Sequence, residues 1–184
     1  MLRVMPQNWE PANWAEEQTS RVAREITRLR GKRSAQWLSD QTNTLGYRVS
    51  RAVIADIENG RRRYVTLSEL TVLAYALGTA PVALLFPPPY GEQIDLLPDH
   101  KTPKFSALQA FCGIAPQVNR LTAHENMQPL RDARLIAELE DQKRWLVIQL
   151  EEFGDSQPEF AKQVRADLDR ITRLLAEKRG QDGG

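Results

Sequence analysis

The sequence predicts an all-α protein: a five-helix domain, an irregular linker and a C-terminal two-helix, coiled-coil-like hairpin. Apolar residues recur at spacings of three and four along most of the 184-residue chain, which places them on one face of a helix. Residues that start helices, such as Ser34 and Thr66, and glycines that end them, such as Gly31 and Gly60, bracket short segments. Prolines recur between residues 87 and 129, where they interrupt regular structure, although Gln93–Leu97 can form a short strand and Phe105–Phe111 a short helix.

Four segments follow from these patterns: an N-terminal arm at 1–18, a helical domain at 19–87, a linker at 88–128 and a helical hairpin at 129–180. We expect the helices of the domain at about 19–30, 34–45, 50–59, 66–77 and 81–86. Thr66 and Glu69 have the spacing of a capping box. We expect Val53, Ile54 and Ile57 to form the inward face of the third helix.

The C-terminal segment has apolar residues at heptad-like spacing on two long helices that are joined by a break at 154–158. Three interpretations are open for it: a hairpin that buries its own apolar seam, a dimerising bundle, or a docking surface for a ligand or partner protein. We favour self-association, because a two-helix hairpin alone buries little surface. The expected interface residues are Ile136, Leu139, Leu146, Leu150, Phe153, Val164, Leu168, Ile171 and Leu175.

Positive charge is concentrated in one part of the chain. The net charge is only +1, but residues 20–64 hold eleven Lys or Arg and four acids, a local charge of +7. The rest of the chain therefore carries −6. A basic block inside an acidic chain is typical of a surface that binds a polyanion.

Several classes of site are excluded or disfavoured. The single cysteine, Cys112, can form neither an intrachain disulfide nor a cysteine-rich zinc site, and His100 and His124 lack metalloprotease spacing. The sequence has no phosphate-binding glycine loop and no set of catalytic nucleophile and base. We therefore expect no metal, no cofactor and no enzymatic activity. No apolar run approaches the roughly 20 residues that span a bilayer, so we expect a soluble, cytoplasmic protein that binds no membrane.

The stretch from Ser50 to Gly60 combines an N-cap serine, a short amphipathic helix and a glycine stop, and three arginines follow it. Arg51 and the small Ala52 and Ala55 are left on its outward side. An outward surface made of small side chains and one arginine can approach another molecule closely.

These residues resemble the lambda-repressor-like (XRE-type) helix-turn-helix family of transcriptional regulators over residues 19–87. The matching residues are Leu38, Ser50, Ile54, Ile57, Glu58, Asn59, Gly60, Leu70, Ala74, Leu77, Gly78, Leu85, Phe86 and Pro87. The resemblance implies a five-helix DNA-binding domain whose third helix enters the major groove. One departure concerns the segment between Leu38 and Ser50, which is longer than usual by about three residues.

The resemblance and the chemistry of the side chains together give candidate contacts. The expected base-reading residues are Ser50, Arg51, Ala52, Arg48 and Asp56. Arg51 can contact guanine with two hydrogen bonds. Asp56 can accept from cytosine, or it can instead orient Arg51 or Arg48. The expected phosphate-binding residues are Ser34, Asn59, Arg61, Arg62 and Arg63.

The sequence therefore predicts a sequence-specific DNA-binding transcriptional regulator that acts as a repressor and as a homodimer on double-stranded DNA. The alternative is an antitoxin-like or adaptor module that binds a protein partner through the C-terminal hairpin.

Overall fold

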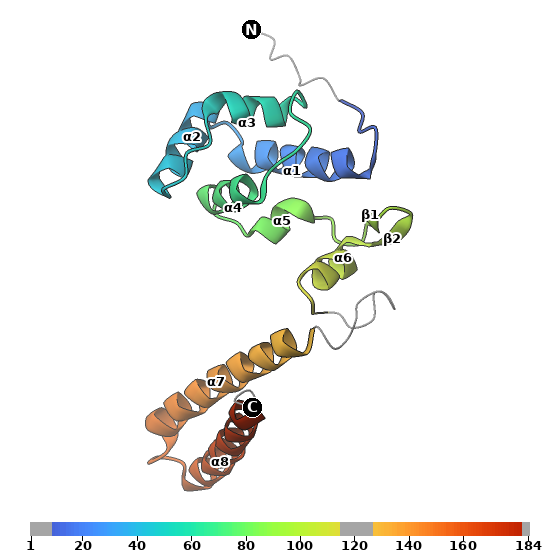
Figure 1. Cartoon of the computed structure of the whole chain (residues 1–184). Helices are drawn as coiled ribbons and strands as arrows, with labels where there is room; N and C mark the ends of the chain where they lie inside the picture. The colour runs from blue at the N-terminus through green and yellow to red at the C-terminus, as the bar shows by residue number, and fades with distance from the viewer. Residues whose placement is uncertain (1–8, 115–126, 182–184) are drawn as a thin grey trace. The chain divides into compact units, whose positions relative to one another are not determined.

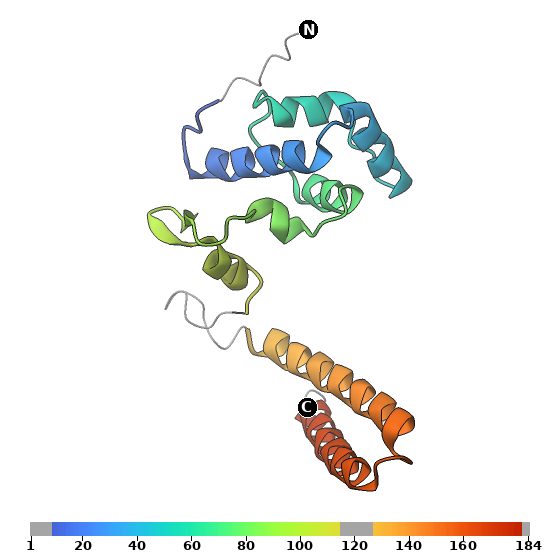
Figure 2. The ribbon, with the colours of Figure 1, turned by 180° about the vertical axis from the view of Figure 1, so that it is seen from behind.

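The computed structural model describes residues 9–114 and 127–181, and the chain is mostly helical there, with one two-stranded sheet (Figures 1 and 2). The chain divides into two compact units, residues 1–118 and 119–184. Parts of two predicted segments lie outside the described residues, 1–8 of the arm and 115–126 of the linker, as do residues 182–184. In the described residues, no helix is long and apolar enough to cross a membrane.

The first helix begins earlier than predicted. Helix α1 spans Trp14–Arg30, so the expected arm at 1–18 is wrong for its last five residues. The cause is a cap, because the side chain of Asn13 accepts a hydrogen bond from the backbone N–H of Glu16 at 3.0 Å. Glu16 and Glu17 add negative charge in the first turn, where the helix dipole favours it.

The next four helices lie close to their predicted positions. They are α2 at Ala35–Thr44, α3 at Arg51–Glu58, α4 at Leu67–Ala76 and α5 at Pro81–Leu85. The capping box at Thr66 is confirmed: its hydroxyl and the carboxylate of Glu69 bond reciprocally across the first turn of α4. In both views α3 lies across α1, with α2 beside the N-terminal end of α3 (Figures 1 and 2).

A shared apolar core holds these helices together. Its most completely buried side chains are Val22, Ile26, Leu38, Ile54, Ile57, Leu73 and Leu84. Each of the five helices contributes at least one of them. Short helices of this kind are marginal alone in water, so packing of their apolar faces supplies most of their stability.

Within the linker predicted at 88–128, the short strand expected at 93–97 and the short helix expected at 105–111 are confirmed, whereas the strand at 100–103 was not predicted. Strands β1, Gln93–Leu97, and β2, His100–Pro103, form an antiparallel hairpin, and helix α6, Lys104–Phe111, follows directly. Ile94 and Ala107 pack with Phe86 in a second small core. The indole N–H of Trp14 donates to the carbonyl of Asp95 at 3.0 Å, which ties α1 to β1.

The second unit is an αα-hairpin. Helices α7, Gln128–Phe153, and α8, Pro158–Gln181, lie side by side in both views and are joined by residues 154–157 (Figures 1 and 2). The apolar side chains buried between them are Leu139, Ala161, Val164, Ile171 and Leu175. Ion pairs cross the seam, among them Lys178 with Asp132 at 3.1 Å and Arg179 with Glu140.

Candidate nucleic-acid interface

Helix α3 has one buried side and one exposed side. Ile54 and Ile57 are almost fully buried, and Val53 packs against the same core, as predicted. Arg51 and Ala52 are exposed at the N-terminal end of the helix. The hydroxyl of Ser50 caps this end by accepting from the N–H of Val53 at 3.3 Å. The burial of these apolar side chains therefore fixes which side chains α3 presents to solvent.

The segment between α2 and α3 is held by a buried threonine. The hydroxyl of Thr42 donates to the carbonyl of Ser39 at 2.8 Å and accepts from the N–H of Val49 at 2.9 Å. Val49 itself is buried. The longer segment is therefore folded over the end of α2, and Arg48 is left exposed with its Nε 3.4 Å from the hydroxyl of Ser39.

A nearly buried ion pair ties the C-terminal end of α3 to α1. The guanidinium of Arg30 donates twice to the carboxylate of Glu58, at 2.7 Å in both hydrogen bonds, and about a tenth of each side chain is exposed. These hydrogen bonds raise the pKa of Arg30 further above its usual range. A bidentate pair of this kind fixes orientation as well as distance, so it positions α3 on the domain.

Gly60 follows the C-terminal end of α3, at a position that has no space for a side chain. Its φ of +73° is in the left-handed region, and a Cβ there would lie 1.9 Å from the indole of Trp9. The same indole lies beneath the guanidinium of Arg63, 5.4 Å from the ring centroid. The described part of the N-terminal arm therefore packs onto the end of α3.

The three arginines after α3 each have an acidic partner. Arg61 pairs with Asp56 at 2.7 Å, Arg62 with Glu69 at 2.6 Å, and Arg63 with Glu16 at 3.0 Å. Their exposed fractions differ: Arg61 is 71% and Arg63 50% exposed, whereas Arg62 is only 18% exposed.

This pattern bears on two predicted residues. The head group of Arg62 is held between Glu69 and the ring of Tyr64, which leaves little of it exposed for another partner. Asp56 orients Arg61, and neither Arg51 nor Arg48.

Ion pairs also change the charge of the basic block. Six of its eleven cations pair with carboxylates, and three of those carboxylates, on Glu16, Glu17 and Glu69, come from outside residues 20–64. These three acids lower the local charge from +7 to +4. In the described residues, five cations of the block have no ion pair: Arg24, Lys32, Arg33, Arg48 and Arg51. The last four flank or begin α2 and α3.

The remaining predicted phosphate ligands lie at helix ends. Ser34 is the exposed N-cap of α2, and its hydroxyl accepts from the N–H of Trp37 at 3.0 Å. Asn59 is the C-cap of α3, and its side-chain oxygen accepts from the N–H of Arg61 at 3.1 Å. Both side chains are therefore partly occupied by capping, while the exposed backbone at the start of α2 remains a site that favours an anion.

Sequence reasoning missed the residues that hold this surface in place, namely Thr42, Glu58 as an ion-pair partner, and Glu16. Thr42 lies four residues after Leu38, where the apolar stripe of α2 would continue, and this spacing is the signal that could have found it. No local pattern indicates that Glu16 meets Arg63, because 47 residues separate them.

The predicted oligomerisation residues lie largely inside the hairpin. Leu139, Val164, Ile171 and Leu175 are at least nine-tenths buried between α7 and α8. Ile136, Leu146, Leu150 and Leu168 are half-buried, and Phe153 is exposed. The most buried part of the seam is therefore an intramolecular core, and an interface between copies has to use side chains that stay at least partly exposed. In the part of the chain that the structure describes, no cluster of three or more His, Cys, Asp or Glu is placed to hold a metal ion.

Comparison with known proteins adds no relative: no protein-family model, no curated protein and no solved structure matches this chain.

Proposed function

We propose that this chain is a sequence-specific DNA-binding transcriptional regulator, acting as a repressor, and that α3 enters the major groove. The observation that supports this most is the two-sided character of α3. Its buried isoleucines fix the helix, and its first turn presents Arg51, unpaired among the described residues, beside the small Ala52. The N-terminal residues of such a helix are those that meet base edges.

The side chains suit distinct contacts. Arg51 offers a planar fork to guanine, and Ala52 offers a methyl group to thymine. Ser50 and Arg48 lie directly before them in the chain and can reach either a base or a phosphate. Asp56 contributes to DNA binding indirectly, because its carboxylate forms an ion pair with the exposed Arg61.

Phosphate contacts come from both ends of the helix pair. The N-terminus of α2, with Ser34 as its cap, and the nearby Lys32 and Arg33 form one group. The exposed head groups of Arg61 and Arg63, after α3, form the other. The arrangement of α1–α5 suits the five-helix, lambda-repressor-like domain that the sequence resembles, and we include that fold assignment in the proposal.

Replacing Arg51 with alanine tests the proposal. DNA ligands are first selected from a random pool and their affinity is measured by electrophoretic mobility shift. We expect Arg51→Ala to weaken binding by about 5- to 150-fold, the range that corresponds to one bidentate base contact of roughly 1–3 kcal/mol. Arg51→Lys should recover little, because lysine keeps the charge but not the fork.

Arg24→Ala is the matched control, since Arg24 is an exposed arginine of α1 that has no ion pair among the described residues. It should bind the selected DNA almost as the unmodified protein does. Equal binding by Arg51→Ala and the unmodified protein, with the fold intact by circular dichroism, would reject the role of α3. So would a selection that enriches no sequence.

A second candidate function is a module that binds a protein partner through the α7–α8 hairpin. It is favoured by large apolar side chains that stay exposed there, among them Trp145 at 60% and Ile148 at 50%. Purification from the native host discriminates the two. A stoichiometric partner, together with no selectable DNA, favours this second function.

A further inference from the structure

The α7–α8 hairpin leaves more large apolar side chains exposed than it buries. Among its described residues, five apolar side chains are buried, whereas seven large ones are at least 37% exposed: Leu130, Leu135, Trp145, Val147, Ile148, Phe153 and Leu174. Small units with so little core generally need oligomerisation or another staple to be stable. The hairpin therefore has apolar surface left for a partner.

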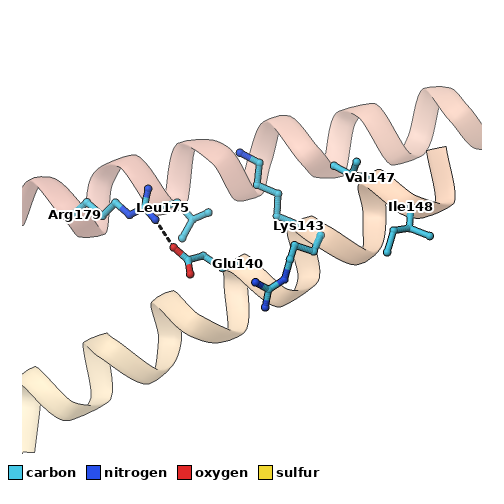
Figure 3. Close-up of a pocket in the computed structure, with 7 residues that line it drawn as sticks. Glu140, Lys143, Val147, Ile148, Leu175 and Arg179 are labelled. Carbon is cyan, nitrogen blue, oxygen red and sulfur yellow. Dashed lines mark hydrogen bonds and ion pairs between the residues drawn. The ribbon is translucent and has the colours of Figure 1, made fainter. Parts of the chain in front are cut away.

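One groove gathers part of this surface. It has a volume of about 540 Å³ and is lined by residues of both helices: Glu140, Lys143, Arg144, Val147, Ile148, Leu175 and Arg179. Figure 3 shows Val147 and Ile148 on α7 and Leu175 reaching across from α8, with the Glu140–Arg179 pair on one side. The groove thus has an apolar centre and a charged end.

The exposed stripe of α7 beside this groove has oppositely charged ends. Arg144, Val147, Ile148 and Glu151 are spaced i, i+3, i+4 and i+7, so they lie on one face of the helix. Arg144 precedes the apolar pair by three residues and Glu151 follows it by three. All four side chains are exposed, Arg144 by 73%.

We propose that this stripe is the contact between two copies of the chain, with the two α7 helices crossing antiparallel at Val147 and Ile148. A two-fold axis through the apolar pair places Arg144 of each protomer against Glu151 of its partner. Such an isologous contact is self-complementary, since the same pair occurs twice. The inference rests on the proposed DNA-binding function, for which the sequence predicts a homodimer, and it names the surface that forms that dimer.

The opposite charges at the two ends of the stripe favour a second copy of the chain over a partner helix whose charges all have the same sign. A purely acidic helix would meet Glu151, and a purely basic one would meet Arg144. Arg144 pairs with Asp141 within α7, but both side chains are more than two-thirds exposed. An exposed pair of this kind contributes little, so Arg144 can exchange it for a partner's carboxylate.

Charge reversal tests the register. Sedimentation equilibrium of the full chain, without DNA, measures the dimer dissociation constant. Arg144→Glu and Glu151→Arg should each raise it by roughly tenfold or more, because either change makes both contacts repulsive. The double variant Arg144→Glu/Glu151→Arg should restore dimerisation. Glu138→Arg, a reversal on a different face of α7, is the control and should leave the constant unchanged.

Disulfide cross-linking keeps the test decisive if a reversal variant fails to fold. In a Cys112→Ser background, Ile148→Cys should form an intermolecular disulfide with an added copper oxidant, because the crossing brings the two positions together. Glu138→Cys should not. A chain that is monomeric at all concentrations overturns the inference, as do single reversals that dimerise normally or a double variant as weak as the singles. None of these outcomes concerns the loss of DNA contacts in Arg51→Ala, which judges α3 separately.

Discussion

The unit built on α1–α5 and the α7–α8 hairpin are both helical, but different interactions hold them. The first has helices of 5 to 17 residues, a core shared by all five, and internal ion pairs such as Arg30–Glu58. The hairpin has helices of 26 and 24 residues, with a narrow apolar seam and ion pairs at its edges. Short helices depend on tertiary packing, whereas long ones approach stability by themselves.

The two units differ in the kind of exposed surface that each has available for binding. In the first unit, packing buries the apolar side chains that face the shared core. The exposed surface between α2 and α3 carries the basic Arg48 and Arg51, together with the exposed Leu45 and Tyr47. In the hairpin, the seam buries one apolar face of each helix, and other apolar side chains such as Trp145 remain exposed to solvent. We therefore assign an anion to the first surface and a second copy of the chain to the other.

The largest expected effect distinguishes the two cores. Ile57→Ala should lower the free energy of unfolding of the first unit by about 3–5 kcal/mol, because it leaves a cavity among fully buried neighbours. Leu175→Ala should cost the hairpin less, about 2 kcal/mol, since its two helices can move together and close the space. Hydrogen exchange resolved by peptide measures both units in one chain. Equal losses would show that the two cores are equally constrained.

A smaller effect concerns the ion pairs of the first unit. Arg30→Ala should destabilise it by about 2–3 kcal/mol, because Glu58 then keeps a largely buried charge without its partner. Arg61→Ala removes an exposed pair with Asp56 and should cost less than about 1 kcal/mol. Chemical denaturation followed by circular dichroism compares them. A loss for Arg61→Ala as large as that for Arg30→Ala would contradict the structural role assigned to Arg30.

The smallest expected effect is a dependence of stability on pH at the start of α4. Burial alone would raise the pKa of Glu69, but the N–H and hydroxyl of Thr66 and the guanidinium of Arg62 hold it below its usual value of about 4.5. Because the folded state lowers this pKa, the stabilisation is complete above about pH 4.5 and is lost as the pH falls through the lower folded value.

Glu69→Gln tests this linkage, because glutamine preserves the capping box but does not titrate. Thermal denaturation between pH 7 and pH 3 should show a shallower loss of stability for the variant than for the unmodified protein. Glu16 and Asp132, whose pKa values are also lowered, remain in both proteins. Identical pH profiles would show that Glu69 contributes nothing to acid sensitivity.

Much of the fold could be predicted from local patterns. The buried face of α3, the capping box of α4 and the break between α7 and α8 all follow from residue spacing and from caps. The start of α1 and the second strand of the hairpin, at 100–103, could not be predicted as well. Asn13 was one polar residue among several before α1. Strand β1 packs on Phe86 through Ile94, and β2 owes its place to pairing with β1.

For the candidate interface, the sequence identified the exposed residues but not their partners. Arg62 and Arg61 are neighbours in the same basic run, yet one is enclosed and the other is 71% exposed. The difference depends on Glu69 and Tyr64, and which of two adjacent arginines meets them is decided by the path of the chain after Gly60. Local sequence cannot supply that path.

The sequence by itself determined that this protein is helical, where its main helices lie, and that α3 buries isoleucines and exposes Arg51. Periodicity and capping are local, so they can be read from neighbouring residues. Only the tertiary structure decided which arginines are neutralised and which apolar side chains of the hairpin remain outside. Both depend on contacts between residues far apart in the chain, such as Glu16 with Arg63, and those contacts exist only after folding.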